Sequence, residues 1–227
     1  MKIKVVGAGG IGTALLLPLS RYLNFNEETV TVTIIDGDSY EDKNQERQNF
    51  HRLGNKAEVA SEKLKEEFPR VAFKFRPEYL TTTSVEYLLE DNDIIFLCVD
   101  NHATRKLVSD YCEQLDEVSL ISGGNDYTDG NIQVYLKSAG KNLTSPIANS
   151  FHPEIVKPRD RNPADLGCGE LIASEPQLIF TNFMIAALML NAFYAYLQGE
   201  VDYDEVYADI LTNNCRAVVR RQVVNAS

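Results

Sequence analysis

The chain has 227 residues, of which 44% are hydrophobic and 24% are charged, so it is long enough for one large domain with a buried core. Its 33 acidic and 22 basic side chains give a net charge of −11. This balance argues against a nucleic-acid-binding protein, which normally presents a basic surface. We therefore expect a soluble protein with no nucleic-acid partner.

The spacing of the cysteines and the N-terminal residues predict the cellular compartment of the protein. The four cysteines, Cys98, Cys112, Cys168 and Cys215, lie far apart and form no C-x-x-C pair. This spacing favours reduced thiols over a disulfide framework. The first residues lead straight into a predicted strand, so we expect no signal peptide and a cytoplasmic location.

Strand-like and helix-like segments alternate along the first 125 residues. Apolar, β-branched runs predict strands at residues 2–6, 30–36, 71–75, 93–99 and 118–121. Amphipathic spacing predicts helices at residues 11–23, 56–68, 83–89 and 102–115. This alternation predicts an α/β fold with a doubly wound, mainly parallel sheet.

Beyond residue 125 the pattern changes. Residues 132–136 predict a further strand, antiparallel after a turn at Asp129-Gly130. Residues 138–173 are rich in Pro, Asn and Gly and predict a long crossing loop. Residues 206–210 and 217–219 predict a terminal hairpin.

The apolar segment 178–197 has the length of a membrane span. It contains Thr181, Asn182 and Asn191 and is flanked by Glu175 and Glu200, which favours a buried core helix and no membrane partner. We expect its aromatic side chains in the core or at a dimer interface; they are Phe180, Phe183, Phe193, Tyr194 and Tyr196.

The strongest local motif is Gly7-x-Gly9-Gly10-x-Gly12, between the first strand and the first helix. In this position it is typical of a nucleotide-binding turn. We expect Gly7 to form the turn, Gly9 to let a phosphate approach backbone N–H groups, and Gly12 to allow close packing. The helix N-terminus then attracts an anion. A glycine turn without a ligand is the alternative.

Polar residues follow the second predicted strand. Asp36 ends that strand, 24 residues after Gly12, where a dinucleotide-binding fold places the acid that binds ribose hydroxyls. Arg47 and Lys56 are cations suited to a polyphosphate. Cleavage of a triphosphate calls for such cations and a metal, whereas a nicotinamide cofactor does not. A solvated loop with scattered charge is the alternative.

Asp100 follows the fourth predicted strand, at the edge where open α/β sheets bind ligands. A carboxylate there could hold Mg²⁺, which prefers oxygen ligands. Alternatively, Asp100 or Asn101 caps the next helix, and both roles can coexist.

Taken in order, these motifs resemble the ThiF/MoeB/HesA family, the bacterial relatives of ubiquitin-activating enzymes. They are Gly7-x-Gly9-Gly10-x-Gly12, Asp36-x-Asp38, Asn44-x-x-Arg47-Gln48, Gly54-x-Lys56 and Asp100-Asn101-x-x-x-Arg105. The resemblance implies a Rossmann-like sheet with additional antiparallel strands after the nucleotide-binding half. It divides one adenylation domain into a nucleotide-binding half (1–125), a substrate half with the crossover (126–200) and a C-terminal hairpin (201–227).

The resemblance also implies an activity: ATP- and Mg²⁺-dependent adenylation of the C-terminal carboxylate of a small ubiquitin-like or sulfur-carrier protein or a peptide, with release of pyrophosphate, by a homodimer. By position, Asp36 would bind ribose and Asp100 would bind Mg²⁺. Arg47 and Lys56 would neutralise charge in the transition state. The other positions expected to contact ATP are Gly7, Gly9, Gly10, Gly12, Asp38, Asn44, Gln48 and Asn101.

The chain departs from the family in three ways. It lacks the two C-x-x-C pairs that hold a structural zinc in many relatives, so we expect no zinc. Its first predicted strand begins at residue 2, so we expect the arginine that an N-terminal extension lends across some dimers to be missing or to come from elsewhere. Cys168 resembles the crossover cysteine that forms a thioester or persulfide in some members, but it has no obvious basic neighbour, and an incidental thiol is the alternative.

Two rival functions stay open. An NAD-dependent oxidoreductase could use the same fold, although Arg47, Gln48 and Lys56 argue against it. A non-catalytic nucleotide-binding scaffold agrees with the missing zinc cysteines and arginine. The three histidines, His51, His102 and His152, are too scattered to predict a metal site.

Overall fold

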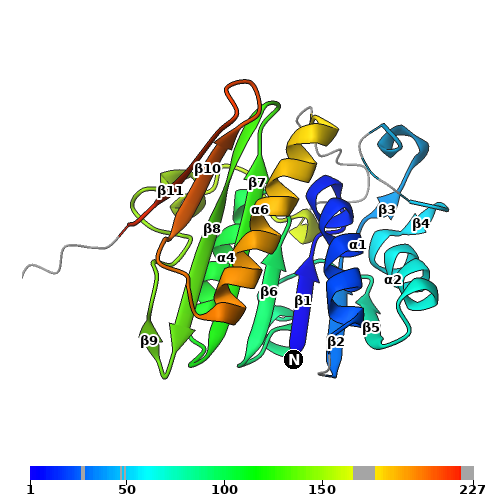
Figure 1. Cartoon of the computed structure of the whole chain (residues 1–227), viewed down its shortest axis with the longest axis horizontal. Coiled ribbons are helices and arrows are strands. Elements are labelled where there is room, and N and C mark those ends of the chain that lie inside the picture. The colour runs from blue at the N-terminus through cyan, green and yellow to red at the C-terminus, as the bar shows by residue number, and fades with distance from the viewer. Residues whose placement is uncertain (27–28, 47, 49, 166–176, 221–227) are drawn as a thin grey trace, which may run out of the picture.

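The computed structural model describes the chain except residues 27–28, 47, 49, 166–176 and 221–227. Among the described residues, a nine-stranded sheet has the order β11-β10-β8-β7-β6-β1-β2-β5, with β9 paired to β8 (Figure 1). A separate two-stranded ribbon joins β3 (Ser39–Tyr40) and β4 (Gly54–Asn55).

One half of the sheet is parallel. It consists of β1 (Lys2–Val6), β2 (Val30–Ile35), β5 (Val71–Arg76), β6 (Asp93–Leu97) and β7 (Val118–Asn125). All five residues of β6 are buried, as expected for a strand covered by helices on both faces. The predicted parallel sheet is therefore confirmed, with strand ends that differ from the prediction by a few residues.

The other half is antiparallel. It consists of β8 (Asp129–Ser138), β9 (Lys141–Asn142), β10 (Glu205–Asp209) and β11 (Asn214–Val218). The predicted terminal hairpin is confirmed, and its strand β10 joins the main sheet beside β8. The predicted turn at Asp129-Gly130 is wrong, because both residues lie in β8 and Asn125 pairs with Gly130. Gly130 instead permits close approach of the neighbouring strand, since a Cβ there would collide with the Gly124 carbonyl oxygen.

Helices cover both faces of the sheet. On one face, α1 (Gly10–Asn24), α2 (Lys56–Glu67) and α6 (Ile179–Gln198) share a core with strand residues such as Ile3 and Phe96. On the other face, α3 (Val85–Leu88) and α4 (His102–Cys112) share a second core with Ile95 and Tyr135. Figure 1 shows α1 and α6 in front of the sheet and α4 behind it. This two-sided cover makes the fold doubly wound.

The long connection between β9 and α6 contains short helices in its described part. They are α5 (Pro153–Val156) and the 3₁₀ helix η2 (Pro163–Asp165); a further 3₁₀ helix, η1 (Asp42–Asn44), follows β3. Ile147 and Ile155 are buried, so this connection packs on the domain. We call residues 143–165 the crossing segment.

The apolar helix α6 has the length and composition of a membrane span, which a core helix of a soluble protein also satisfies. Ile185, Met189 and Phe193 are fully buried in the core shared with α1. Phe193 therefore has the expected core position, whereas Phe180, Phe183 and Tyr194 are more than half exposed, which leaves the dimer interface as the expectation for these three.

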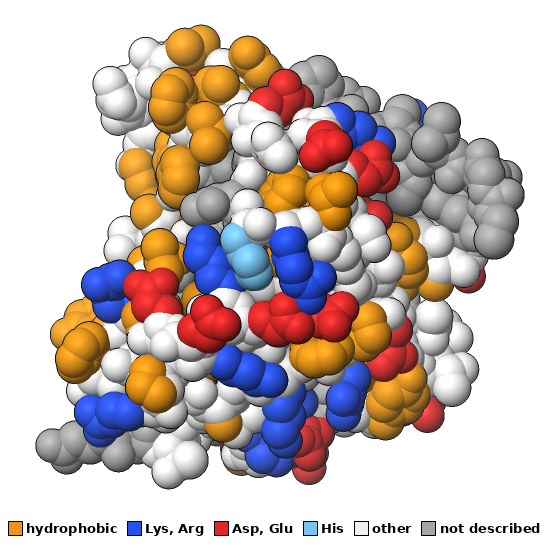
Figure 2. Space-filling model, turned by 90° about the vertical axis from the view of Figure 1, so that its right-hand side faces the viewer, with side chains coloured by type: hydrophobic (Ala, Val, Ile, Leu, Met, Phe, Trp, Pro, Cys, Tyr) orange, Lys and Arg blue, Asp and Glu red, His pale blue; other side chains and the backbone are white. Residues whose placement is uncertain are grey.

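The side of the molecule that carries α2 has charges of both signs. Figure 2 shows Lys and Arg side chains interspersed with Asp and Glu there. Exposed ion pairs to α2 include Arg52 with Glu62 and Arg21 with Glu67. This mixed face differs from the basic surface typical of nucleic-acid-binding proteins.

Candidate functional site

A pocket of about 1460 Å³ lies at the carboxyl ends of the parallel strands, where open α/β sheets bind ligands. It continues across the sheet to Tyr207 in β10. The structure brings most of the predicted site residues together in this pocket: Gly7, Gly9, Gly10, Asp36, Asp38, Asn44, Gln48, Lys56, Asp100 and Asn101. Gly12 does not line it, and Arg47 and Cys168 lie outside the described residues.

The glycine turn connects β1 directly to α1. Gly7 has a φ of +92°, and a Cβ there would lie 2.8 Å from the Cys98 carbonyl oxygen. A Cβ on Gly12 would collide with the Gly7 carbonyl oxygen, whereas a Cβ on Gly9 would meet only Gln48 Nε2, at 3.9 Å. Gly7 and Gly12 are thus required by the packing, and Gly9 keeps the pocket side of the turn open.

Asp36 holds the glycine turn in place. Its carboxylate accepts hydrogen bonds from the backbone N–H of Ala8 at 2.6 Å and of Asp38 at 2.8 Å. Burial raises the pKa of Asp36, against the opposing effect of Lys56 and these two N–H groups. A carboxylate offers about four acceptor positions, so Asp36 can still accept bonds from two hydroxyl groups.

Lys56 is buried, with 7% of its surface exposed, and it begins α2. Its Nζ lies 2.5 Å from Asp38 Oδ2, and its backbone N–H donates to the Asp38 carbonyl oxygen at 2.9 Å. Asn55 caps α2 and also donates to the Asp36 and Asp38 carbonyl oxygens. The β3–β4 ribbon thus fixes Lys56 beside Asp38 and near Asp36, the acid that holds the glycine turn. A bound anion would compete with Asp38 for the positive charge of Lys56.

Asn44 and Gln48 are both buried beside the turn. Asn44 Oδ1 accepts the backbone N–H of Glu41, the N-cap residue of the short helix η1, at 2.9 Å and so completes the capping box of that helix. Gln48 Oε1 is buried with no hydrogen-bond partner among the described residues. Because an unpaired buried amide oxygen is costly, Gln48 is the better placed of the two to bind a ligand.

Asp100 and Asn101 follow β6. Asp100 is exposed and lines the pocket, whereas Asn101 caps α4 by accepting the Thr104 N–H at 2.8 Å. The predicted cap is therefore Asn101, and Asp100 is left for another role. Asp160 of the crossing segment accepts the N–H groups of His102 at 2.7 Å and Ala103 at 2.9 Å. The first turn of α4 is thus already bonded to a carboxylate of the chain.

Arg105 joins the ends of β6 and β7. It is 6% exposed and donates to Val99 O at 2.9 Å, Gly123 O at 2.8 Å and Ser122 Oγ at 3.1 Å. Burial lowers the pKa of Arg105, and Asp100 opposes that shift. These contacts give the arginine of the Asp100-Asn101-x-x-x-Arg105 motif a structural role at the pocket floor.

The donor set of the pocket fits one hard cation. In the described part of the chain, no group of three or more His, Cys, Asp or Glu side chains could hold a metal ion. Mg²⁺ commonly takes one or two carboxylates and completes its shell with phosphate oxygens and water. The exposed carboxylate of Asp100 meets that requirement.

The cysteine environments differ. Cys98 and Cys112 are buried, and burial raises the pKa of Cys98 to about 12. Cys215 is exposed on β11, away from the glycine turn. A high pKa keeps a thiol protonated and unreactive, so neither buried cysteine is suited to nucleophilic attack.

Sequence reasoning missed three residues around the pocket. Asp160 gave no signal within a loop of mixed composition. Tyr79 lies against Gly37, where a Cβ would come within 2.6 Å of its ring. Asn182, on the first turns of α6, fills the space that a Cβ on Gly10 would need. Its buried side-chain amide has no hydrogen-bond partner among the described residues. The polar character of Asn182 within an apolar helix was the available signal.

A doubly wound sheet with a glycine turn, an acid after β2 and a polar pocket at the strand ends defines a Rossmann-type nucleotide-binding protein. The sequence matches the ThiF family over residues 1–223. The chain belongs to the ThiF family.

The curated relatives match part of the chain. "Adenylyltransferase and sulfurtransferase uba4" of Emericella nidulans is 34% identical over 137 residues, which are 59% of this chain and 27% of the relative. The UBA4 protein of Lodderomyces elongisporus is 29% identical over 164 residues, 69% of this chain and 33% of the relative. The match thus spans about a third or less of these longer proteins.

Solved structures with the same fold include MccB of E. coli bound to succinimide. Its TM-score is 0.73 at 15% identity, over 98% of this chain and 65% of that one. The crystal structure of PaaA gives a TM-score of 0.69 at 18% identity, over 97% of this chain and 64% of that one. At these identities the likeness concerns the fold alone.

Proposed function

We propose that this protein is an ATP- and Mg²⁺-dependent adenylyltransferase that activates the C-terminal carboxylate of a small carrier protein or peptide. The observation that carries the proposal is the joining of a glycine turn, Asp36, the buried cation Lys56 and the exposed Asp100 in one pocket. A hydride-transfer site has no evident use for Lys56 or Asp100. Membership of the ThiF family supports the same class of reaction.

The acceptor is proposed from the pocket and the relatives. At about 1460 Å³, the pocket exceeds the roughly 300–1,000 Å³ of common small-molecule sites, so it has room for a second reactant beside a nucleotide. Relatives are named adenylyltransferase and sulfurtransferase, and MccB has been crystallised with MccA. These names support a sulfur-carrier protein or a peptide as the class of acceptor.

The proposed reaction forms a bond between a carboxylate oxygen and the α-phosphorus of ATP, and it breaks the bond from that phosphorus to the bridging oxygen. Pyrophosphate takes the electron pair and leaves. Gly9 and the N-terminus of α1 would position phosphate, and Asp36 would accept the ribose hydroxyls. Lys56 would offset the charge that develops in the transition state.

Three further roles complete the proposal. Asp100 would hold Mg²⁺, which would offset phosphate charge when bound. Arg47 would act as a second cation, and Cys168 would take part in any later transfer; both come from the family resemblance. We also propose a cytoplasmic location.

The test is exchange of labelled pyrophosphate into ATP, with Mg²⁺ and a candidate carrier protein or peptide that has a free C-terminus. We expect exchange that depends on the acceptor and is lost when its C-terminal carboxylate is amidated. ATP binding without exchange for any acceptor would favour a nucleotide-binding scaffold. NAD binding without ATP binding would favour the oxidoreductase.

We propose a homodimer as the assembly. Support comes from exposed apolar side chains on the adjacent helices α1 and α6, namely Leu17, Tyr22, Phe180, Phe183 and Tyr194. The rings of Tyr22 and Tyr194 also contact each other edge to face, and exposed apolar patches are typical of interaction sites. Light scattering after gel filtration should give twice the monomer mass, and Phe183→Ser should reduce it toward the monomer. A monomeric wild-type protein would contradict the proposal.

A further inference from the structure

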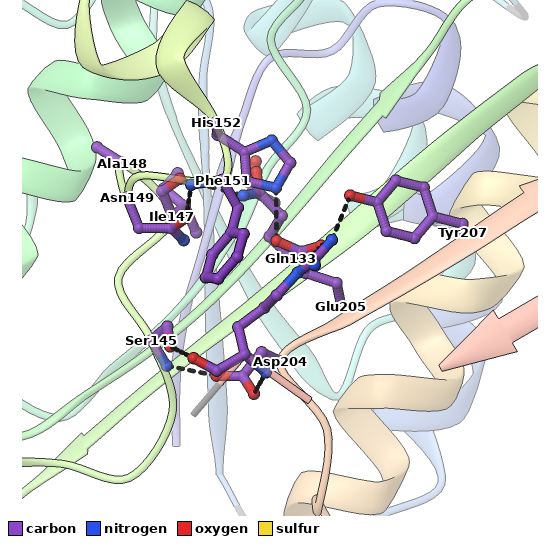
Figure 3. Close-up of polar contacts among 12 residues, drawn as sticks. Gln133, Ser145, Ile147, Ala148, Asn149, Phe151, His152, Asp204, Glu205 and Tyr207 are labelled. Atoms are coloured by element: carbon purple, nitrogen blue, oxygen red, sulfur yellow. Dashed lines mark hydrogen bonds and ion pairs between the residues drawn. The ribbon is translucent and has the colours of Figure 1, made fainter. Parts of the chain in front are cut away.

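A polar cluster lies at the end of the pocket away from the glycine turn. We call it the His152 cluster; it comprises His152, Glu154, Glu205, Tyr207 and Arg220. His152 Nδ1 lies 2.8 Å from Glu154 Oε1. His152 Nε2 lies 2.5 Å from Glu205 Oε1, a contact that Figure 3 shows as a dashed line. His152 is 6% exposed and Glu205 is 1% exposed. One imidazole thus bridges the crossing segment and β10.

Both contacts of His152 are to carboxylate oxygens, which fixes its protonation state. A neutral imidazole has one N–H donor and one acceptor nitrogen, whereas an ionised carboxylate only accepts. Two hydrogen bonds to two carboxylates therefore require the imidazolium. After loss of its proton, His152 can keep one of these bonds, and its other nitrogen then faces an oxygen lone pair.

The neighbouring groups keep both carboxyls ionised. Arg220 Nε donates to Glu205 Oε2 at 3.1 Å, and Arg220 Nη2 donates to the Tyr207 hydroxyl at 3.2 Å. Burial opposes ionisation of Glu205 and Glu154, but the pKa of each is lowered. For Glu205 the main lowering cause is the hydrogen bond to His152, and for Glu154 it is a backbone N–H bond, followed by the hydrogen bond to His152. Burial likewise lowers the pKa of His152, but the two carboxylates prevail and raise it above 6.5.

Charged groups from other elements also face the cluster. His102 and Arg105 on α4 act electrostatically on Glu154. Asp204, before β10, accepts the backbone N–H groups of Ser145 at 2.6 Å and Arg220 at 2.7 Å. Among the described residues, His152 is therefore the group of this cluster best placed to change its charge near neutral pH.

The His152 cluster borders the pocket. Phe151, His152, Glu154 and Tyr207 line the pocket, and the first three come from the crossing segment. That segment is held by several contacts, including those of Asp160 to α4, of Ile147 O to Gln133 in β8 and of Ser145 to Asp204. At residues 151–154 the contacts to other segments include His152 with Glu205 and Arg220 over the Phe151 ring. Loss of the His152–Glu205 contact would therefore loosen this part of the pocket wall.

We propose that His152 is a positioning residue whose imidazolium, by bridging Glu154 and Glu205, holds residues 151–154 as a wall of the acceptor half of the pocket. The acceptor role of that half rests on the proposed function, whereas the bridge itself does not. His152 acts on the acceptor through the position of the crossing segment and takes no part in the adenylation chemistry.

The stabilisation by His152 should weaken as pH rises. Because the folded state raises the pKa of His152, the stabilisation is complete below the unfolded value of about 6.5 and is lost as pH rises through the folded value. Glu154→Gln should remove this dependence. The amide introduced by that substitution can donate to Nδ1 of neutral His152 while Nε2–H donates to Glu205, so the bridge no longer needs the extra proton.

The test measures hydrogen exchange in the peptides that cover residues 145–156, between pH 5.5 and 8.5, and needs no substrate. The exchange rates are corrected for the intrinsic pH dependence of amide exchange. In the wild type we expect protection to fall with rising pH, by roughly tenfold for each unit of raised pKa. Glu154→Gln should keep its protection, and His152→Gln should be unprotected throughout. Asp110→Asn, an exposed carboxylate on α4, is the matched control and should follow the wild type.

A second readout concerns the reaction. The KM for the acceptor should rise with pH in the wild type, stay level in Glu154→Gln and be high throughout in His152→Gln, with kcat less affected. Equal pH profiles of protection in the wild type and Glu154→Gln would overturn the proposal, as would full protection in His152→Gln. Absence of pyrophosphate exchange in the wild type would refute the proposed function and leave the protection result to decide on the bridge.

Discussion

The two ends of the pocket are built in different ways. The nucleotide end uses residues 7–56, where strand, glycine turn and acid follow one another and most contacts are to backbone groups. The end that we propose for the acceptor uses side chains of His152, α5, β10 and Arg220, which meet through side-chain ion pairs. A site of the first kind is fixed by local turns, whereas a site of the second kind depends on how distant segments pack.

The largest expected effect tests the local end. Gly12→Ala adds a Cβ that collides with the Gly7 carbonyl oxygen, so either α1 or the turn must shift. We expect a loss of about 3 kcal/mol in the free energy of unfolding, measured in urea, together with loss of ATP binding. Gly9→Ala is the control, because its Cβ has open space and should leave stability almost unchanged. Equal stability of the two variants would show that the turn tolerates a shift.

The second prediction concerns charge at the nucleotide end. Lys56→Ala and Asp100→Ala should each lower pyrophosphate exchange by at least about 100-fold, the usual effect of removing one group that stabilises charge in the transition state. Both should fold, because Asp100 is exposed and Asp38, the partner of Lys56, is half exposed. Lys2→Ala removes a lysine from an exposed ion pair with Glu90 and should keep full activity. Near wild-type exchange in either site variant would disprove the assigned role.

The third prediction concerns Arg105, which lines the pocket and joins the ends of β6 and β7. Arg105→Ala leaves Val99 O and Gly123 O without their donor. We expect a loss of about 2 kcal/mol in unfolding free energy, since buried acceptors without partners are costly. Denaturation of Lys106→Ala, an exposed neighbour on α4, provides the control. A smaller loss for Arg105→Ala than for the control would assign Arg105 to ligand binding rather than to structure.

The smallest expected effect concerns the pH dependence of stability, which should have separate contributions from Asp93 and His152 in two pH ranges. Asp93 begins β6, at the opposite end of that strand from the pocket, and burial raises its pKa from 3.8 to about 6. The folded state therefore holds this proton more tightly, and stability should fall as pH rises from about 4 to 6. Asp93→Asn should flatten that range and leave the dependence above pH 6.5, assigned to His152, unchanged. Denaturation curves recorded across both pH ranges measure the two dependences. If Asp93→Asn changed the dependence above pH 6.5, that dependence would not belong to His152.

Most of the nucleotide end could be predicted because its signals are local. Hydrophobic periodicity gave the parallel strands and the helices, and Gly7, Gly12 and Asp36 have the predicted geometry. The binding roles of these residues stay predictions. The error at Asp129-Gly130 has a physical cause: glycine serves turns and close strand contacts equally well, and the sequence alone does not distinguish them.

The acidic composition, the alternation of strands and helices and the glycine turn were determined by the sequence itself, since each depends on residues near one another in the chain. Tertiary structure decided which groups meet: Lys56 with Asp38, Asp160 with the first turn of α4, and His152 with Glu205. The last two contacts join residues 58 and 53 positions apart. Such pairs depend on the path of a crossing segment whose own composition predicts only a loop.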